Sequence, residues 1–432
     1  MKNKIKCIVI ATSLCIHLFG CGNTPNSEPD TIEQAKTVKL WSGYCMIGED
    51  ELDMDQSEWI LSKLVNEYNL SHDDIKVDFT YFDDDEALVQ ALKAATETGT
   101  EAPDIAVVQS GKYLADISDL FSPIDEFISD DYYNSNNYWE TTLINGNHYG
   151  YPTTGVNVTY FAYNRELIKQ AGLNFDTNPP KTLDEFKTDL NIIKSAGITP
   201  ITAGDYECND LFSTVFAKWW FQQSNIDDIS QDGYLFSNDT GFINACEIAQ
   251  DFWNNSYIVD NYVTNEDTLS DIINGKAALY NTFIFELGIL EAEMGDNLGI
   301  IPVPDYSDNC NYKGLSLGSC NQCMSITANS QSKEESADFI EWLLNKENSI
   351  KLYNVYKGMP IRNDVSLDEL GWKSDDNYVE IEKMMNTIIT YPDYLVFGAS
   401  EMADAYYTYG PLLITGKEFP IDYAKKIDDS AT

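Results

Sequence analysis

The alternation of strand and helix patterns near the start of the chain constrains its fold more than any other feature. Short runs of β-favouring residues occur at 38–41, 75–79 and 105–108, and the last has the composition of a fully buried strand. Between these runs, apolar residues recur at helical spacing over 59–68 and 88–95. This order predicts an α/β fold with a mostly parallel sheet covered by helices. Ligands of such sheets bind beyond the carboxyl ends of the strands.

A second α/β stretch follows the first. A long β-type run covers 156–163, and the helical patterns after it end at Gly172 and Gly197. The second of these helices begins at residues 182–185, which have the pattern of a capping box. Short β runs return from residue 298, and no internal repeat is evident, which argues against a structural adhesin.

The chain is expected to form two lobes. The pattern breaks near Thr153, Pro302 and Leu344, and we expect the chain to cross between the lobes at these points. The prediction divides the chain into a first lobe of residues 37–152 plus 303–345 and a second lobe of residues 153–302 plus 346–432.

The N-terminus is predicted to be an export signal with a lipid site. Lysines at 2, 4 and 6 precede an apolar run at 8–19, which is too short for a comfortable membrane span. Leu18-Phe19-Gly20-Cys21 resembles the bacterial lipobox, so residues 1–20 are predicted to be a signal peptide and Cys21 a lipidation site. Residues 21–36 would be a flexible tether. We therefore expect an exported protein, anchored by lipid to the outer face of a membrane.

Charge excludes several classes of function. The chain has 27 basic and 70 acidic residues, and its formal net charge is −43. Such a field repels phosphate backbones and anionic lipids, so we expect no nucleic-acid partner and no electrostatic docking on a membrane. It also disfavours strongly anionic ligands. With three histidines in the chain, mechanisms that need a histidine cluster are nearly excluded.

The cysteines leave their pairing open. Six lie beyond the predicted lipid site, which allows fifteen full disulfide connectivities. The spacing of Cys320 and Cys323 occurs in redox and half-zinc motifs, but no second pair accompanies it. Packing thiols or a local disulfide are therefore favoured over zinc, and no metal or cofactor is predicted. The six are Cys45, Cys208, Cys246, Cys310, Cys320 and Cys323.

Five blocks in the right order carry a family resemblance, and together they cover most of the chain. They are residues 102–108 (APDIAVV), 145–152 with 163–172 (NGNHYGYP and YNRELIKQAG), 180–186 (PKTLDEF), 273–278 (INGKAA), and 333–344 with 358–362 (the last GMPIR). The chain thereby resembles extracellular solute-binding proteins of the carbohydrate ABC-importer type.

The resemblance implies both a fold and a function. The fold would be the two-lobed, periplasmic-binding-protein-like type II fold, with a hinge between the lobes. The protein would be a monomer without enzymatic activity. It would capture a carbohydrate, expected to be an oligosaccharide, and deliver it to the permease subunits of an ABC importer.

Candidate ligand contacts are polar and aromatic residues just past the expected strand ends. Sugars stack their C–H faces on aromatic rings, and their hydroxyl groups need directed donors and acceptors. Family members often place a polar ligand contact after the first hinge crossing, here Asn157, and the family's final turn supplies Arg362. The family's usual glycine-x-tryptophan is absent after the fourth block, where residues 281–285 read NTFIF. The candidates are Trp41, Ser42, Tyr44, Gln109, Ser110, Asn157, Tyr206, Asp210, Asn281, Phe283 and Arg362.

Several alternatives stay open at the level of sequence. A surface glycoside hydrolase would use two carboxylates, and seventy acidic residues make chance pairs inevitable. The chain could instead bind another small polar solute or serve a sensor. A nucleophilic triad would need His72 or His148 as its base, and both histidines are expected on the solvated surface. The acidic residues 49–55 could hold calcium, but they lack EF-hand spacing, which favours a solvated loop.

Overall fold

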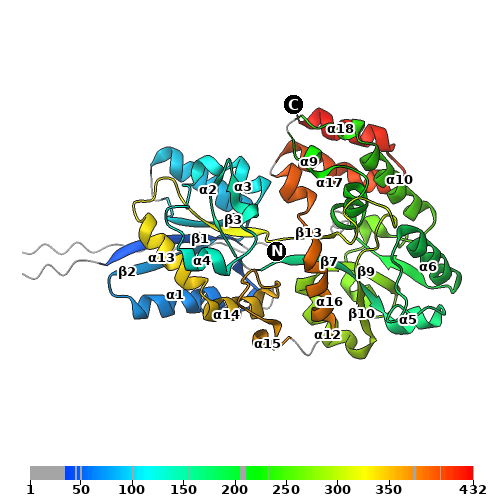
Figure 1. Cartoon of the computed structure of the whole chain (residues 1–432), viewed down its shortest axis with the longest axis horizontal. Helices are drawn as coiled ribbons and strands as arrows, with labels where there is room; N and C mark the ends of the chain where they lie inside the picture. The colour runs from blue at the N-terminus through cyan, green and yellow to red at the C-terminus, as the bar shows by residue number, and fades with distance from the viewer. Residues whose placement is uncertain are drawn as a thin grey trace, which may run out of the picture.

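Two lobes lie side by side in the computed structural model, as Figure 1 shows. The structure describes residues 35–43, 46–48, 51–99, 102–153, 155–204, 211–231, 233–372, 376–398 and 400–431. The predicted signal peptide, Cys21 and most of the predicted tether lie outside these residues, as do the candidate contacts Tyr44, Tyr206 and Asp210. Within the described ranges, no helix has the length and apolar character that a membrane span requires.

The first lobe is built on a five-stranded sheet with the order β2-β1-β3-β12-β6. Strand β1 pairs in parallel with β2 and β3, which confirms the predicted alternation of strands and helices. Strand β12 runs antiparallel between β3 and β6, so the sheet is mixed and not mostly parallel. Its strands are β1 (Lys36–Ser42), β2 (Ile75–Tyr81), β3 (Ile105–Gln109), β6 (Tyr151–Pro152) and β12 (Gln322–Ile326).

Helices cover both faces of this sheet, and local sequence explains where they begin. The Asp84 carboxylate accepts a hydrogen bond from the Glu86 N–H at 3.1 Å and so caps the N-terminus of α2. Gly99, with φ of +63°, ends the same helix. The helices of this lobe are α1 (Ile60–Ser71), α2 (Asp85–Thr98), α3 (Lys112–Asp116), α4 (Asp130–Ser135), α13 (Lys333–Leu343) and α14 (Lys346–Tyr356).

The second lobe is built on a six-stranded sheet with the order β13-β11-β7-β9-β8, and β10 also pairs with β7. Strand β7 is antiparallel to β9, β10 and β11, while β8 is parallel to β9. This sheet is therefore mixed as well. Its strands are β7 (Asn157–Asn164), β8 (Thr199–Thr202), β9 (Ala277–Phe283), β10 (Leu298–Ile301), β11 (Ser316–Ser319) and β13 (Ile388–Ile389).

Side chains of β7 alternate between two hydrophobic cores, one on each face of the second sheet. Phe161 and Tyr163 enter one core, and Tyr160 and Ala162 enter the other. The predicted cap of α6 is present, because the Thr182 hydroxyl accepts from the Glu185 N–H at 3.4 Å. The helices of this lobe are α5 (Arg165–Gln170), α6 (Leu183–Ser195), α8 (Ala217–Phe221), α9 (Ile226–Ile229), α10 (Thr240–Asn254), α11 (Thr268–Ile273), α12 (Leu287–Met294), α16 (Asp376–Met384), α17 (Glu401–Ile414) and α18 (Pro420–Ser430). Helix α15 (Leu367–Leu370) lies against α14 of the first lobe (Figure 1).

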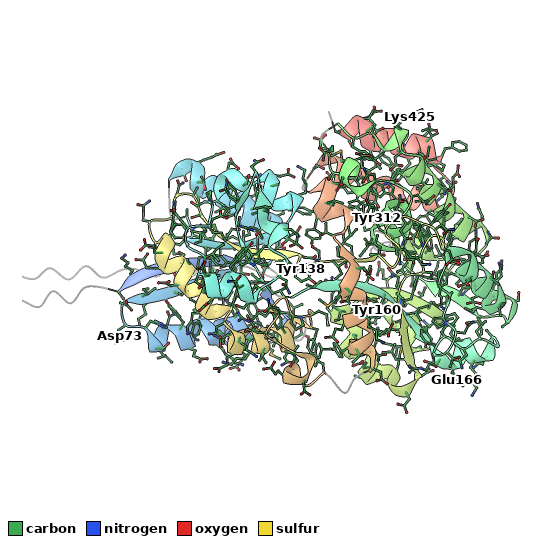
Figure 2. All side chains as sticks on the ribbon, viewed as in Figure 1. Asp73, Tyr138, Tyr160, Glu166, Tyr312 and Lys425 are labelled. Carbon is green, nitrogen blue, oxygen red and sulfur yellow. The ribbon has the colours of Figure 1, made fainter. Side chains whose placement is uncertain are left out.

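Two crossings between the sheets differ from the predicted division. The chain returns to the first sheet between β11 and β12, at residues 320–321, and not near Pro302, because β11 still pairs with β7. The final crossing comes after α15 and not after Leu344, because Leu352 of α14 is buried in the core of the first lobe and α15 contacts α14. Tyr138 of the first lobe packs on the core of the second, between the two lobes in Figure 2.

Candidate ligand-binding site

The strand ends of the two lobes meet where the chain crosses between β11 and β12. Gln109, at the end of β3, lies opposite Gln322, and Asn157, at the start of β7, lies opposite Ser319. Three residues of extended chain span about 10 Å, so Gln109 and Asn157 lie about that far apart along the crossing. We call the residues around this crossing the junction: Gln109, Asn157, Phe283, residues 319–322 and Tyr391.

Two amide oxygens at the junction lack a hydrogen-bond donor among the described residues. The Oδ1 atoms of Asn157 and Asn321 are both shielded from solvent and have no partner there. A buried acceptor without a donor costs about 1–3 kcal/mol, which a ligand hydroxyl group would relieve. The junction can therefore accept hydrogen bonds from a polar, neutral ligand.

Aromatic rings gather beside these amides. Phe283 lies opposite Thr159, two residues along β7 from Asn157. Its ring stacks on Phe285, with centroids 5.5 Å apart and planes 10° apart, and meets Tyr391 edge-on at 5.9 Å. The Tyr391 hydroxyl donates to the Asn157 carbonyl oxygen at 3.3 Å, which fixes this ring at the junction.

Three residues at or beside the junction were not predicted as ligand contacts from the sequence: Phe285, Tyr391 and Asn321. Phe285 is two residues from the predicted Phe283, so a search for paired rings at the end of β9 could have found it. Tyr391 comes from a segment more than two hundred residues after Asn157, and no local pattern marks it as a neighbour. Asn321 was not considered because the second crossing was predicted near Pro302, whereas Asn321 lies in the observed crossing.

Trp41, a predicted ligand contact, is half-buried at the carboxyl end of β1. Its ring lies 5.0 Å from the ring of Phe82, tilted by 52°, and packs against the first-lobe cluster that contains Val108. The Trp41 ring thus packs against protein atoms, and the residue remains partly exposed to solvent.

Three predicted contacts have protein partners in the structure. The hydroxyl of Ser42, which is fully buried, donates to the Gly43 carbonyl oxygen at 3.2 Å. The Ser110 hydroxyl donates to the Cys320 carbonyl oxygen at 2.6 Å and ties β3 to the crossing. Asn281 accepts from the Thr214 hydroxyl at 2.6 Å and donates to the Tyr160 carbonyl oxygen at 3.1 Å. These side chains hold the walls of the junction in place.

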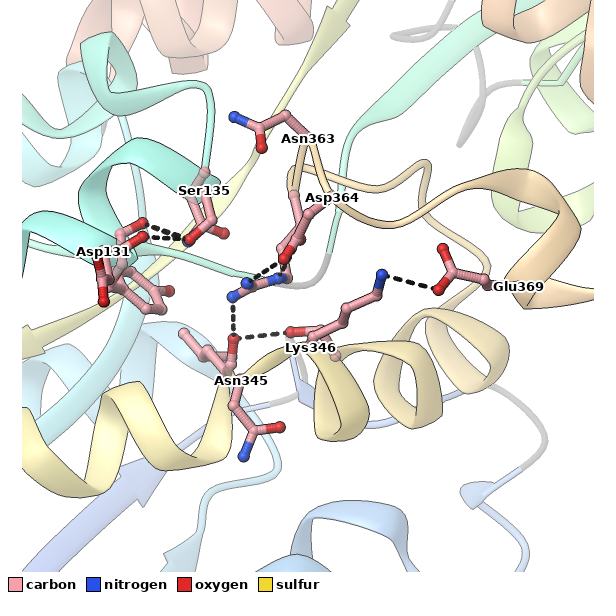
Figure 3. A network of polar contacts seen from close by, with 12 residues as sticks. Asp131, Ser135, Asn345, Lys346, Asn363, Asp364 and Glu369 are labelled. Carbon is pink, nitrogen blue, oxygen red and sulfur yellow. Dashed lines mark hydrogen bonds and ion pairs between the residues drawn. The ribbon is translucent and has the colours of Figure 1, made fainter.

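Arg362 holds the segment that leads to the third crossing on the first lobe, and Figure 3 labels its partner Asp364. Its guanidinium donates to both carboxylate oxygens of Asp364, at 2.8 and 2.9 Å, and to the Leu344 carbonyl oxygen at 3.0 Å. The Asp364 carboxylate raises the pKa of Arg362, and the residue is only 8% exposed. Nearby, Lys346 pairs with Glu369 at 2.8 Å. We therefore assign Arg362 to the support of the crossing.

The two histidines considered as bases are engaged with aromatic rings and are not freely solvated. His148 lies 2.8 Å from Asp125 Oδ1 and 5.3 Å from the ring of Trp139. His72 stacks on Tyr68 with centroids 3.9 Å apart. Both residues are half-buried, which corrects the expectation of a solvated surface.

Cysteine chemistry at the crossing is suppressed by burial. Cys320 and Cys323 are unbridged and fully buried, and burial raises the pKa of each thiol to about 12. Of the two alternatives favoured by the sequence, packing thiols are present and the local disulfide is not.

In the part of the chain that the structure describes, no group of three histidine, cysteine or acidic side chains could hold a metal ion. The Glu51 carboxylate, from the acidic stretch considered for calcium, accepts from the Gly48 and Ile60 N–H groups.

The fold and the junction define a class of protein: a two-lobed α/β binding protein whose lobes are joined by several crossings. The profile described as bacterial extracellular solute-binding protein matches residues 63–379. The chain therefore belongs to this family of binding proteins. No curated protein sequence matches the chain.

Solved structures share the whole architecture. The cyclic α-maltosyl-1,6-maltose binding protein from Arthrobacter globiformis is 18% identical, with a TM-score of 0.73 over 92% of this chain and 98% of its own. The sugar-binding protein MalE from Xanthomonas citri is also 18% identical, with a TM-score of 0.72 over 91% and 96%. A chitin oligosaccharide binding protein is 17% identical, with a TM-score of 0.73 over 92% and 98%. At this identity the likeness establishes the fold.

Proposed function

We propose that this chain is the binding component of an ABC importer and captures a neutral oligosaccharide between its two lobes. The observation that carries the proposal is the junction, where two amide oxygens without a donor in the described part of the chain lie beside a group of aromatic rings. Directed acceptors next to aromatic faces are what a sugar requires. The sugars named for the structural neighbours, cyclic maltosyl-maltose and chitin oligosaccharide, support the same class of ligand.

In this proposal the ligand contacts come from both lobes. Gln109 and Trp41 would contribute from the first lobe, and Asn157, Phe283 and Tyr391 from the second. Tyr44, Tyr206 and Asp210 remain proposed contacts on the grounds of their sequence positions. A ligand held from both sides favours the arrangement in which the lobes are closed on it, since that arrangement makes the larger set of contacts. The closed form would then dock on the permease subunits as a monomer.

A glycoside hydrolase is the main competing function. The residues that define the junction are amides, aromatic residues, Ser319 and Cys320, without a carboxylate, and the protein's family consists of binding proteins. These observations favour binding without turnover. A different small polar solute, or delivery to a sensor, would use the same junction.

Thermal unfolding in the presence of single sugars tests the ligand class. A neutral oligosaccharide at 100 times its Kd should stabilise the mature chain by about 2.7 kcal/mol and raise Tm by several degrees. Asn157→Ala should lose most of this shift, while Asn191→Ala, an exposed amide on α6, should keep it. A panel of mono- and oligosaccharides that leaves Tm of the wild type unchanged would refute the proposed ligand class.

Trp41→Ala tests the wall contributed by the first lobe. Stacking on an aromatic ring is worth roughly 0.5–1.5 kcal/mol beyond area burial, so sugar affinity should fall by about tenfold. An unchanged affinity together with a sharply lower Tm would mean that Trp41 only packs against Phe82.

Lipid attachment at Cys21 is part of the same proposal. Cys21→Ser should leave the protein uncleaved or release it from the membrane. Fractionation in detergent, together with N-terminal sequencing, measures both outcomes. A variant that partitions and is processed like the wild type would contradict lipidation at this residue.

A further inference from the structure

The two lobes also touch next to the junction, where the ring of Tyr394 lies 6.4 Å from the ring of Tyr391. Helix α3 belongs to the first lobe, because Leu114 is buried with Leu88 and Val108. The π-helical segment η12 (Asp393–Phe397) belongs to the second lobe, because Phe397 is buried in the core that contains Tyr406. Helix α3 lies on the side of the first lobe that faces the second (Figure 1), and it contacts η12.

Each side of this contact carries a glycine that faces the opposite lobe. A Cβ atom on Gly111 would lie 2.4 Å from the Tyr394 carbonyl oxygen and 3.1 Å from Tyr394 Cβ. A Cβ atom on Gly398 would lie 2.4 Å from Asp116 Oδ2 and 2.7 Å from Lys112 Cγ. Contacts this short leave no room for a side chain, so the close approach of the lobes depends on glycine at both positions.

Side chains around the two glycines complete the contact. The rings of Tyr113 and Tyr394 lie 5.5 Å apart with a tilt of 57°, a separation typical of favourable aromatic pairs. Lys112 and Asp116 form an ion pair along α3, and this pair lies against Gly398. Protein atoms from both lobes thus form a continuous contact that needs no ligand atom.

We propose that α3 and η12 form a latch that holds the two lobes in the arrangement seen here. The latch shifts the equilibrium between this arrangement of the lobes and more open ones. It rests on the proposed function in one respect, namely that a bound solute would also favour this arrangement. A protein whose binding-competent arrangement is less populated shows a proportionally weaker apparent affinity. The latch therefore sets the apparent affinity through the population of this arrangement.

Gly111→Leu is the variant that should open the latch, because the obstructing atom is a backbone oxygen that cannot rotate away. Gly295→Leu is its matched control: φ and ψ are +51° and −132° at Gly295 and +64° and −135° at Gly111, but nothing lies within 4 Å of a Cβ atom at Gly295. Tyr113→Ala is a second latch variant, which removes the ring contact without placing a side chain at positive φ.

Small-angle X-ray scattering of the mature chain without added sugar measures the arrangement directly. Gly111→Leu and Tyr113→Ala should each have a larger radius of gyration than the wild type, and Gly295→Leu should match the wild type. An unchanged radius of gyration in folded Tyr113→Ala refutes the latch, even if Gly111→Leu fails to fold.

Titration of the same variants with a sugar that binds the wild type supplies the second measurement. Opening the latch should weaken binding by at least about fivefold, in proportion to the lost population. If the wild type binds no sugar but the scattering changes as predicted, the latch stands and the ligand class is wrong. If sugars bind but the variants neither expand nor bind more weakly, the latch is wrong and the ligand class stands.

Discussion

Lys218 should be the most stabilising charged residue of the second lobe. Its side chain is 4% exposed, and its Nζ atom lies 3.0 Å from Oδ1 of Asp305, whose side chain is 11% exposed. It also donates to the Val303 carbonyl oxygen. Burial lowers the pKa of Lys218, and the nearby Asp305 carboxylate opposes that effect. The pair fastens the start of the loop between β10 and β11 to α8.

Lys218→Met removes one charge of this buried pair and keeps the side-chain volume. Breaking a buried pair by removing one partner costs about 3–5 kcal/mol, because the other charge stays buried without compensation. Asp305 keeps hydrogen bonds from Gln222 at 2.7 Å and from the Gly314 N–H at 3.0 Å, which argues for the lower end of that range. For a lobe of about 150–250 residues, a loss of about 3 kcal/mol in the free energy of unfolding corresponds to a fall in Tm of roughly 6–12 °C.

Circular dichroism melting at pH 7 measures the effect, and Lys313→Met is the control. Lys313 pairs with Asp308 at 3.1 Å in the same loop, but the two side chains are 59% and 79% exposed. An exposed pair contributes at most about 1 kcal/mol, so the control should melt close to the wild type. If Lys218→Met melts within about 2 °C of the control, which corresponds to less than about 1 kcal/mol, the buried pair does not stabilise the loop as argued.

Three further predictions concern single groups. Cys320 and Cys323, with pKa values raised to about 12 by burial, should resist a thiol reagent at pH 8 in the native protein and react only after denaturation; rapid reaction without denaturant would contradict their burial. Burial raises the pKa of Asp189 to about 6, so Asp189→Asn should raise Tm at pH 8 and lose this gain as the pH falls through 6 to below 4; a gain that persists at low pH would show another cause. Arg362→Lys cannot reproduce the two hydrogen bonds to Asp364 and should destabilise the chain by about 1–3 kcal/mol in chemical denaturation; no change in the midpoint would contradict the clamp.

Local sequence was sufficient for the elements whose signals are local. The capping pattern at residues 182–185 and the glycine at 197 marked α6, and the structure shows Thr182 capping its start and Gly197, with φ of +78°, just past its end. The second crossing could not be predicted in the same way. Strand β11 reads SLGS, without β-branched residues or clear alternation, and only its pairing with β7 assigns it to the second lobe.

The candidate contacts show the same limit. Asn281 follows a family block, but Thr214, which binds its side chain, lies 67 residues earlier in the chain. Tyr391 reaches Asn157 across 234 residues, so only the fold brings them together. Arg362 carried a usable signal, because Asp364 lies two residues away and can bind the guanidinium from within the same turn.

Isothermal titration of the mature chain with neutral oligosaccharides, followed by chromatography of the recovered sugar, tests directly whether the protein binds an oligosaccharide without cleaving it. We expect saturable heat of binding for at least one oligosaccharide, loss of that heat in Asn157→Ala, and recovery of the sugar intact. Release of shorter sugars in proportion to enzyme and time would contradict this expectation, because the protein would then be a hydrolase. Saturation by a non-carbohydrate solute alone would contradict the proposed ligand class.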